Sequence, residues 1–389
     1  MPWETRELRK VREEFVRLAL APGANKRELM RGFGVSPATA YKWIARYREG
    51  GSAALEDRSR QPKNSPRRTS AAMEQRIVEL RQEHPAWGGR KVARVLKNQG
   101  VKNVPAPSTI TEILRRHGLL CEPSRERRNY QSFERARPNE LWQMDFKGEF
   151  SLKNRRRCYP LTACDDHSRF NVVLGACSDM KTETVQSCLR RAFERYGLPD
   201  AILCDNGAPW SSNWTGGYTK LDVWFMLLGV QVIHGRPYHP QTQGKEERFH
   251  RTLKVELLGR AEGFTDHDDC QKELDRWREC YNWIRPHESL GMEVPGTRFE
   301  PSPRKLPELP IDPRQWYLED DCLRKVQTHG TVEFQAKRLR VGEAFRGQTV
   351  ALRPRMENVW EMRFGSTLIG VYDLSETPPG QVAIRPIKS

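Results

Sequence analysis

Hydrophobic residues recur every three or four positions along the first 120 residues, which is the pattern of amphipathic helices. The clearest case spans residues 36–51, where Ser36 and Pro37 are suited to begin a helix and Gly50 and Gly51 to end it. The predicted buried stripe consists of Ala40, Trp43, Ile44 and Tyr47. The opposite face presents Thr39, Lys42 and Arg46.

Another predicted helix lies before this one, and a short turn joins the two. Asn25 is a favourable N-cap, and Glu28 follows three residues later, as in a capping box. Two helices joined in this way are typical of a helix-turn-helix, which places its second helix in the major groove of DNA. Thr39, Lys42 and Arg46 are then candidate DNA contacts, and an ordinary three-helix bundle is the alternative.

Residues 71–120 repeat this plan. The pattern predicts two helices broken at "HPAWGG" and a third in "PSTITEILRRHGLL", with Ser108 as its cap and Gly118 as its stop. The residues expected to pack inward are Ile110, Ile113 and Leu114. The residues expected outside, as further DNA contacts, are Thr109, Thr111, Arg115 and Arg116. Periodicity alone does not distinguish a winged helix from a plain bundle here.

A stretch rich in Pro, Ser and Arg separates the two helical modules. Such a composition predicts a linker rather than a folded element. Its Arg67 and Arg68 are expected to lie along a phosphate backbone. Two tethered DNA-binding modules gain affinity over one through effective concentration.

From about residue 138, short apolar runs alternate with helical segments. Strands are predicted in "ELWQMDFKGEF", "CYPLTACDDHSRF", "NVVLGACS", "DAILCDNG" and "VQVIHGRP". Helices are predicted in "KTETVQSCLRRAFERYG", which Gly197 ends, and in "LDVWFMLLG". Strands in succession that later alternate with helices imply a mixed α/β sheet.

A Pro-rich stretch, "PSPRKLPELPIDPRQ", marks a boundary before the C-terminal part. Beyond it, "TVEFQAKRLRV", "QTVALRPR", "VWEMRF" and "TLIGVYDL" have the alternation of short strands, with turn signals between them. Such a set predicts a small β-barrel of SH3-like size. Its basic residues, which either contact DNA or form a solvated face, are Arg338, Arg340, Arg353 and Arg355.

The positive charge of the chain is concentrated in its N-terminal third. The 389 residues carry a net charge of +16, and residues 1–138 hold 30 Lys and Arg against 15 Asp and Glu, whereas the remainder holds 36 against 35. A positive excess confined to the helical modules favours a polyanionic partner, nucleic acid above all. No apolar run approaches a membrane span, and the first ten residues do not resemble a signal peptide.

The nine cysteines are odd in number and contain no CxxC pair, which argues against both a disulfide framework and a zinc finger. A reducing cytoplasm is the expected compartment.

The middle region supplies candidate catalytic carboxylates. Asp145 lies within an apolar strand, where an unpaired carboxylate would be costly, and Asp205 lies at the carboxyl end of another strand. Two converging carboxylates repel each other unless a divalent cation holds them, although each aspartate could instead be structural. In "QGKEERFH", periodicity puts Glu246 on the apolar side of a helix and Glu247 on the polar side, which favours Glu247 as the third acid.

These motifs resemble those of a known family. "WQMDF", "LCDNG" and "YHPQTQGKEERFHRTLK", in that order, are similar to the three acidic motifs of the DDE transposases and retroviral-type integrases, and "DDHSRF" and "YNWIRPHESL" resemble landmarks of the bacterial insertion-sequence branch. The resemblance covers about residues 138–292. It implies an RNase H-like catalytic core in which Asp145, Asp205 and Glu247 are both catalytic residues and metal ligands.

The resemblance also implies chemistry and partners. Two Mg²⁺ ions about 3.5–4 Å apart, which Mn²⁺ may replace, would support cleavage that frees a 3′ end and its transfer to target DNA. Residues expected to position DNA near the acids are His239, Gln241, Gln243, Lys245, Arg248, Arg251 and Lys254. Asp165 and Asp166 are expected to be structural, because three acids already satisfy the metals.

Two features depart from the compact integrases. Between Asp205 and Glu247 lie 41 residues, and an insertion at 208–220 leaves the roles of Trp210 and Trp214 open. The His/Cys zinc module that precedes retroviral cores is missing from residues 1–120, which contain no cysteine. The helical modules are therefore expected to read DNA instead.

The expected protein is multidomain, with all-α helix-turn-helix modules, a central α/β RNase H-like core and a small β-barrel. The expected boundaries are a helix-turn-helix domain at 1–52, a basic linker at 53–70, a second, winged-helix-like helix-turn-helix domain at 71–120, a linker at 121–137, the integrase core at 138–300, a Pro-rich linker at 301–317 and the barrel at 318–389.

The leading hypothesis is a DNA transposase of an insertion sequence that binds the terminal inverted repeats and target DNA. It would act in the bacterial cytoplasm on the nucleoid, as a homo-oligomer that is at least a dimer, with a partner ATPase possible. The alternatives are a DNA-binding regulator with an inert core and a metal-dependent nuclease that does not join strands.

Overall fold

The chain forms two compact units, Met1–Arg68 and Thr69–Ser389. The computed structural model describes residues 8–57, 68–120, 134–205, 207, 209–210, 217–234, 244–259, 263–308, 310–375 and 385–386. Among these residues, no helix combines the length and apolar character that crossing a membrane requires.

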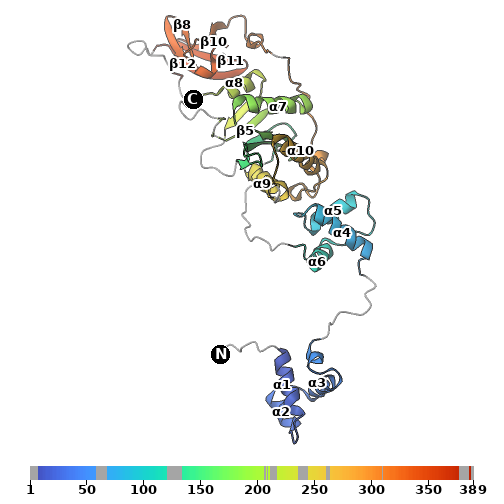
Figure 1. Ribbon diagram of the computed structural model, residues 1–389. Coiled ribbons are helices and arrows are strands. Elements are labelled where there is room, and N and C mark those ends of the chain that lie inside the picture. The colour runs from blue at the N-terminus through green and yellow to red at the C-terminus, as the bar shows by residue number, and fades with distance from the viewer. Residues whose placement is uncertain are drawn as a thin grey trace. The chain divides into compact units, whose positions relative to one another are not determined.

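In the first unit, residues 8–57 form three α-helices and one 3-10 turn (Figure 1). They are α1 (Leu8–Ala19), α2 (Lys26–Gly32), α3 (Pro37–Gly50) and η1 (Ser52–Leu55). The predicted caps are confirmed: the Asn25 side chain accepts from the Glu28 N–H at 3.3 Å, and Ser36 accepts from the Thr39 N–H at 3.3 Å. Gly51, with φ +64°, follows the last residue of α3.

The second unit begins with a separate three-helix module. It contains α4 (Ala71–Glu83), α5 (Gly89–Asn98) and α6 (Pro107–Arg116), as predicted. The expected cap at Ser108 is wrong, because α6 begins at Pro107 with Ala106 before it. Proline is pre-organised for the first helical position, so the helix starts two residues earlier than a cap at Ser108 would place it.

A mixed sheet forms the middle of the second unit and confirms the predicted α/β core. Its strands are β1 (Trp142–Phe146), β2 (Phe150–Ser151), β3 (Arg157–Asp165), β4 (Asn171–Cys177), β5 (Ala201–Cys204) and β6 (Gln231–His234). The path of pairing is β2-β3-β1-β5-β6, and β4 pairs with β3. β1, β5 and β6 run parallel to one another, whereas β3 is antiparallel to β1 and β4.

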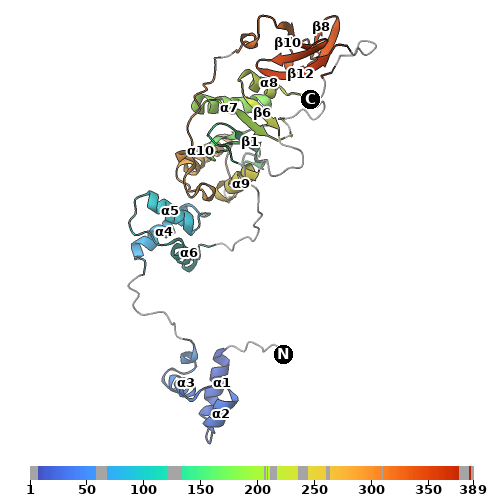
Figure 2. The same ribbon diagram turned by 180° about the vertical axis from the view of Figure 1, so that it is seen from behind.

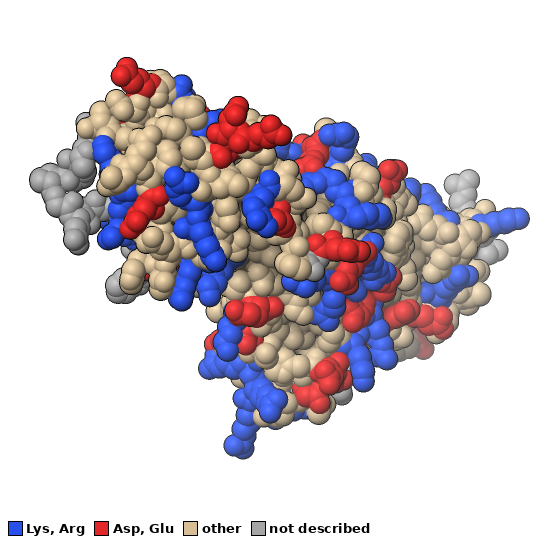
Figure 3. Space-filling view, turned by 90° about the horizontal axis from the view of Figure 1, so that it is seen from above, with Lys and Arg blue, Asp and Glu red and all other residues tan. Residues whose placement is uncertain are grey.

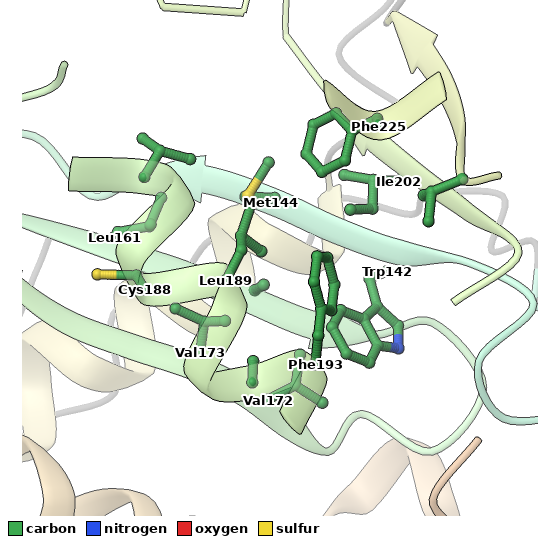
Figure 4. Packing of buried hydrophobic residues seen from close by; sticks show 14 of the residues in the cluster. Trp142, Met144, Leu161, Val172, Val173, Cys188, Leu189, Phe193, Ile202 and Phe225 are labelled. Carbon is green, nitrogen blue, oxygen red and sulfur yellow. The ribbon is translucent and has the colours of Figure 1, made fainter. Parts of the chain in front are cut away.

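Helices cover both faces of this sheet, as the two opposite views show (Figures 1 and 2). They are α7 (Thr182–Tyr196), α8 (Lys220–Leu227), α9 (Gly244–Leu253), its π-helical continuation η3 (Lys254–Leu258) and α10 (His267–Trp283). Leu189 and Phe193 of α7 pack over Met144 and Trp142 of β1 (Figure 4). On the other face, residues of α9 and α10 form a second cluster with side chains of β3 and β4.

Short 3-10 turns follow the core. They are η4 (Glu288–Leu290), η5 (Pro295–Thr297), η6 (Pro313–Trp316) and, within the C-terminal part, η7 (Glu343–Phe345).

The C-terminal part is built from strands, as predicted. They are β7 (Cys322–Lys325), β8 (Thr331–Phe334), β9 (Lys337–Arg340), β10 (Thr349–Met356), β11 (Val359–Phe364) and β12 (Thr367–Asp373). The order β12-β11-β10-β7 makes a four-stranded sheet, and β8 and β9 form a hairpin. Both sheets share one hydrophobic cluster, while closure into a barrel stays a prediction. The sequence reading missed β7, because Arg324 and Lys325 interrupt its apolar alternation.

Candidate active site

Parallel pairing brings two of the predicted acids to the same edge of the sheet. β1 and β5 pair Trp142 with Ile202 and Gln143 with Leu203. Continuing this register by two residues sets Asp145 opposite Asp205, which follows the last residue of β5. The carboxyl ends of parallel strands are where open α/β sheets usually place their chemistry.

Alternation along β1 decides which way Asp145 faces. Trp142 and Met144 belong to the cluster under α7, so Gln143 and Asp145 point to the opposite face, where α9 lies. Burial raises the pKa of Asp145 to about 6, and the charge of Asp205 adds to the effect. The backbone N–H of Phe146 donates to the Asp145 carboxylate at 2.7 Å, which partly offsets the cost of its charge.

The two neighbouring glutamates of α9 face opposite ways. Glu246 is 1% exposed, whereas Glu247 is exposed. The charge of Glu247 is among those that raise the pKa of Asp145. The polar face of α9 and η3 that carries Glu247 also exposes Arg248, Arg251 and Lys254. The predicted orientation of both glutamates is therefore confirmed, while the catalytic role of Glu247 stays a prediction.

A buried polar network ties α9 to the sheet beneath Asp145. Thr162, which pairs with Asp145 across β3 and β1, donates from Oγ1 to the Asp145 carbonyl at 3.0 Å. The same hydroxyl oxygen lies 3.0 Å from Glu246 Oε2 and 2.8 Å from His250 Nε2. A hydroxyl has one proton, so the other two partners must donate to it.

The charge states of that network follow from burial. Burial raises the pKa of Glu246 to about 8 and lowers the pKa of His250 to about 3. Both side chains are therefore neutral near pH 7, although His250 Nε2 and Glu246 Oε2 are 3.7 Å apart. A protonated carboxyl and a neutral imidazole supply the two N–H or O–H donors that Thr162 requires.

Sequence reasoning missed Thr162 and His250. His250 was detectable in principle, because it follows Glu246 by four residues on a helix and so lies on the same buried face. Thr162 was not, because its position beside Asp145 depends on the register of two strands.

Asp145, Asp205 and Glu247 fit a divalent cation by chemistry. Oxygen ligands are those that Mg²⁺ prefers, and a cation would relieve the mutual repulsion that raises the pKa of Asp145. Within the described part of the chain, no three His, Cys, Asp or Glu side chains are gathered closely enough to hold one ion.

Asp165 and Asp166 have structural partners, as expected. Asp165 accepts from the Ser168 and Asn139 N–H groups at 2.7 Å each. Asp166 accepts from Gln143 Nε2 at 2.6 Å and forms an ion pair with Lys245 at 2.5 Å. The Lys245 side chain thus joins α9 to the loop after β3, and its predicted DNA contact stays a prediction.

The predicted DNA contacts of the first unit surround one tryptophan. The guanidinium of Arg46 lies 4.9 Å and the ammonium of Lys42 5.7 Å from the Trp43 ring. Lys42 is exposed, but Thr39 and Arg46 are half-buried. The Thr39 hydroxyl also hydrogen-bonds Ser36 at 2.9 Å, so Lys42 is the most accessible of the three.

In the second module, Thr109, Arg115 and Arg116 are exposed as predicted. Arg116 pairs with Glu74 at 3.1 Å. The outward placement of Thr111 is wrong: it is half-buried, and its Oγ1 lies 2.4 Å from where a Cβ on Gly89 would be. Helices α5 and α6 approach closely there because Gly89 has no side chain.

Several predicted sites are outside the described residues. They are Arg67, Trp214, His239, Gln241 and Gln243. Arg68 is described and exposed. Trp210 is buried and stacks on Phe146, with 5.6 Å between the ring centroids, so it packs beside β1.

The C-terminal arginines are largely paired. Arg353 binds Asp321 through two hydrogen bonds of 2.8 and 2.9 Å. Arg338 lies 3.9 Å from Glu333 and Arg355 3.8 Å from Glu361. One face of the molecule likewise shows Lys and Arg interspersed with Asp and Glu (Figure 3). This mixture favours a solvated face over a DNA-binding patch.

Several protein families match successive, partly overlapping regions of the chain. Residues 11–63 match the family described as a helix-turn-helix domain, and residues 39–114 match a homeodomain-like domain. Residues 135–240 and 228–295 match two families described as integrase core domains. Residues 321–379 match the C-terminal domain of IS481 family transposases.

Two curated bacterial proteins are similar to this chain. The insertion element IS476 uncharacterized 39.2 kDa protein of Xanthomonas euvesicatoria is 28% identical over 239 residues, which are 60% of this chain and 66% of that protein. The insertion element IS407 uncharacterized 31.7 kDa protein of Burkholderia multivorans is 27% identical over 226 residues, which are 57% of this chain and 78% of that protein. The similarity to IS476 thus spans just under two thirds of that relative.

Solved structures of viral integrases are also similar. A chain of the simian T-cell lymphotropic virus intasome, solved with the PP2A regulatory subunit B56 gamma, has a TM-score of 0.37 and 16% identity, covering 75% of this chain and 97% of its own. The catalytic core domain of HTLV-2 integrase, solved with magnesium, has a TM-score of 0.32 and 13% identity, covering 42% and 97%.

Proposed function

We propose that the chain is a DDE transposase of an insertion sequence, which binds the terminal inverted repeats of its element and cuts and joins their 3′ ends with Asp145, Asp205 and Glu247. The observation that carries the catalytic part is the register of β1 and β5, which sets Asp145 opposite Asp205. The exposed Glu247 on α9 completes the set, because its charge acts on Asp145.

The protein's own part in the reaction is to hold three carboxylates close together although their negative charges repel one another. β1 and β5 fix two of the carboxylates from the backbone, and Thr162 anchors the carbonyl of Asp145. Neutral Glu246 and His250 add no charge of their own beneath the site. This arrangement keeps the negative field on the outer side, where a cation and DNA can reach it.

Asp145, Asp205 and Glu247 would hold two Mg²⁺ ions, which activate an attacking oxygen and stabilise a leaving oxygen in phosphoryl transfer. Water as the nucleophile frees the 3′-OH of an element end, and that 3′-OH then attacks a target phosphodiester. The exposed Arg248, Arg251 and Lys254 on the same face would bind the phosphates on either side of the scissile bond.

The helical modules would read the element ends. α3 and α6 each end a three-helix module and expose basic residues, Lys42 on α3 and Arg115 on α6. Paired ends must be cut together, so we propose a homo-oligomer of at least two subunits, each of which contributes one set of carboxylates.

A strand-transfer assay tests this proposal. Purified protein is incubated with Mg²⁺ or Mn²⁺, a supercoiled target and labelled duplexes that carry the element's own ends. We expect wild type to join 3′ ends to the target, and Asp145→Asn, Asp205→Asn and Glu247→Gln each to lower joining by at least about 10²-fold while end binding persists.

Glu246→Gln is the matched control on the adjacent residue. Glutamine keeps the size of a protonated glutamic acid and a donor for Thr162, so this variant should retain most of the joining activity. Loss of joining in Glu246→Gln but not in Glu247→Gln would show that Glu246, and not Glu247, is the third catalytic acid. Cut ends without joined products would indicate a nuclease, and tight end binding with neither product would indicate a regulator.

A further inference from the structure

Asp205 has a second neighbour, on the side away from Asp145. β5 and β6 are parallel, and their pairing sets Cys204 opposite His234, the last residue of β6. His234 Nδ1 lies 3.4 Å from the Asp205 carbonyl oxygen. Across β3, β1 and β5, Thr162, Asp145 and Asp205 are therefore level with one another, whereas His234 of β6 is level with Cys204, the residue before Asp205.

The other ring nitrogen of His234 faces a buried carboxylate. His234 Nε2 lies 3.6 Å from Asp222 Oδ1, and Asp222 is 3% exposed. The second oxygen of Asp222 is engaged elsewhere, because Oδ2 accepts from the Thr219 N–H at 2.6 Å and from its hydroxyl at 2.8 Å. Asp222 is therefore fixed by the cap of α8 and directs its free oxygen at His234.

Helix α8 itself is held from both sides. Phe225 packs in the cluster of the catalytic core, whereas Val223 and Met226 pack in the cluster of the C-terminal sheets. Tyr218, just before the helix, contacts Phe345 edge to face, with 5.4 Å between the ring centroids. Helix α8 therefore holds Asp222 in a fixed place, and the ring of His234 lies between Asp222 and the end of β5.

We propose that His234 is a positioning residue for Asp205, held in place by Asp222, and that this pair sets the affinity of the site for its divalent cation. The inference rests on the proposed function, because it assumes that Asp205 is a metal ligand. His234 does not bind the cation itself. It holds the backbone of Asp205, whose carboxylate is the ligand.

A purely structural histidine would be expected to be buried, whereas the side chain of His234 is 35% exposed and lies outside the hydrophobic clusters of the described residues. Its ring contacts three polar partners: the Asp205 carbonyl, Asp222 Oδ1 and, at 3.9 Å, the Cys204 sulfur. Groups that orient metal ligands in this way typically change metal affinity or activity by about 10–100-fold when they are removed.

The test measures Mn²⁺ binding to the full-length protein without DNA, from the electron paramagnetic resonance signal of the free ion. We expect His234→Ala to weaken binding by about tenfold, and His234→Gln, whose amide can donate to one of the two acceptors, to weaken it less. Asp222→Asn, which keeps an oxygen for Thr219 but removes the charge, should also weaken binding. His329→Gln on an exposed turn is the matched control and should bind as wild type does.

Asp205→Asn separates this inference from the proposed function. If Asp205→Asn weakens Mn²⁺ binding but His234→Ala and Asp222→Asn bind as wild type does, the positioning role is wrong and the metal site stands. If Asp205→Asn also binds as wild type does, the metal site itself is wrong. Should His234→Ala fail to fold, wild-type affinity in both His234→Gln and Asp222→Asn overturns the inference, and weakened affinity in either one supports it.

Discussion

The first helical unit and the catalytic core differ in what they bury. Within residues 8–57 of the first unit, all buried side chains are hydrophobic, and they are Phe15, Val16, Ala19, Met30, Ala40, Trp43, Ile44 and Leu55. The core also buries polar side chains, among them Gln143, Thr162, Asp165, Asp166, Asn171, Asp222, Glu246, His250, Asn282 and His287. Burying polar groups costs free energy unless each finds a partner.

The buried polar groups of the core share one property: most of them connect two elements. Thr162 links β3 to β1 and faces α9, and Gln143 joins β1 to Asp166. A hydrophobic contact persists when its side chains shift slightly, whereas a hydrogen bond forms only within a narrow range of distance and angle. The core therefore buries polar side chains, despite their cost in free energy, where carboxylates must be held accurately. The helical unit needs only a stable surface and buries hydrophobic side chains.

The largest test of this difference concerns Asn282 on α10. Its side chain accepts from the Asn171 N–H at 2.9 Å and donates to the Asn171 carbonyl at 3.0 Å, locking α10 to β4. Asn282→Leu leaves both backbone groups buried and unpaired, so we expect the free energy of unfolding of the core to fall by about 2–4 kcal/mol. Native-state hydrogen exchange of the β4 amides measures this change.

Leu274→Met, also buried on α10, is the control for that experiment. A swap that conserves volume usually costs less than about 1.5 kcal/mol. If both variants lose the same free energy of unfolding, packing alone stabilises this face of the sheet, and the two hydrogen bonds between Asn282 and Asn171 do not.

The same contrast explains how far the sequence could predict the molecule. Periodicity located α3 and the opposite faces of Glu246 and Glu247, because a helix repeats regularly and its caps are local. It could not locate partners such as Thr162 and His234, since these depend on which residues pair across strands. Asp145 and Asp205 were found as acids at strands, but only the register of β1 and β5 sets them side by side.

A second test uses pH to probe His287, which follows α10. Burial, with the charge of Arg285 beside it, holds the pKa of His287 well below its usual value. Below about pH 6.5 the unfolded chain therefore binds a proton that the folded core does not, and stability falls as the pH falls. The loss for this residue should reach about 1.4 kcal/mol between pH 7.5 and 5.5.

His287→Gln isolates this contribution, because glutamine does not titrate and can still accept from Arg285, whose Nη1 lies 3.3 Å from His287 Nε2. The stability difference between wild type and His287→Gln should shrink by that amount between pH 7.5 and 5.5, as measured by urea unfolding at each pH. His329→Gln, on an exposed turn, should keep a constant difference from wild type. A pH-independent difference for His287→Gln would show that His287 takes up its proton at the same pH in the folded core as in the unfolded chain.

The smallest effect is expected in the first helical unit, where polar groups act at helix ends. Ser36 caps α3 by accepting from the Thr39 N–H, and that N–H lies at the surface. Ser36→Ala should therefore lower the local stability of α3 by only about 1 kcal/mol, because water can replace the lost acceptor, and Ser36→Asp should restore it. Hydrogen exchange of the α3 amides measures both changes. If Ser36→Ala lost as much stability as Asn282→Leu, the comparison would be contradicted. An exposed helix cap would then stabilise the protein as much as the buried hydrogen bonds of Asn282 do.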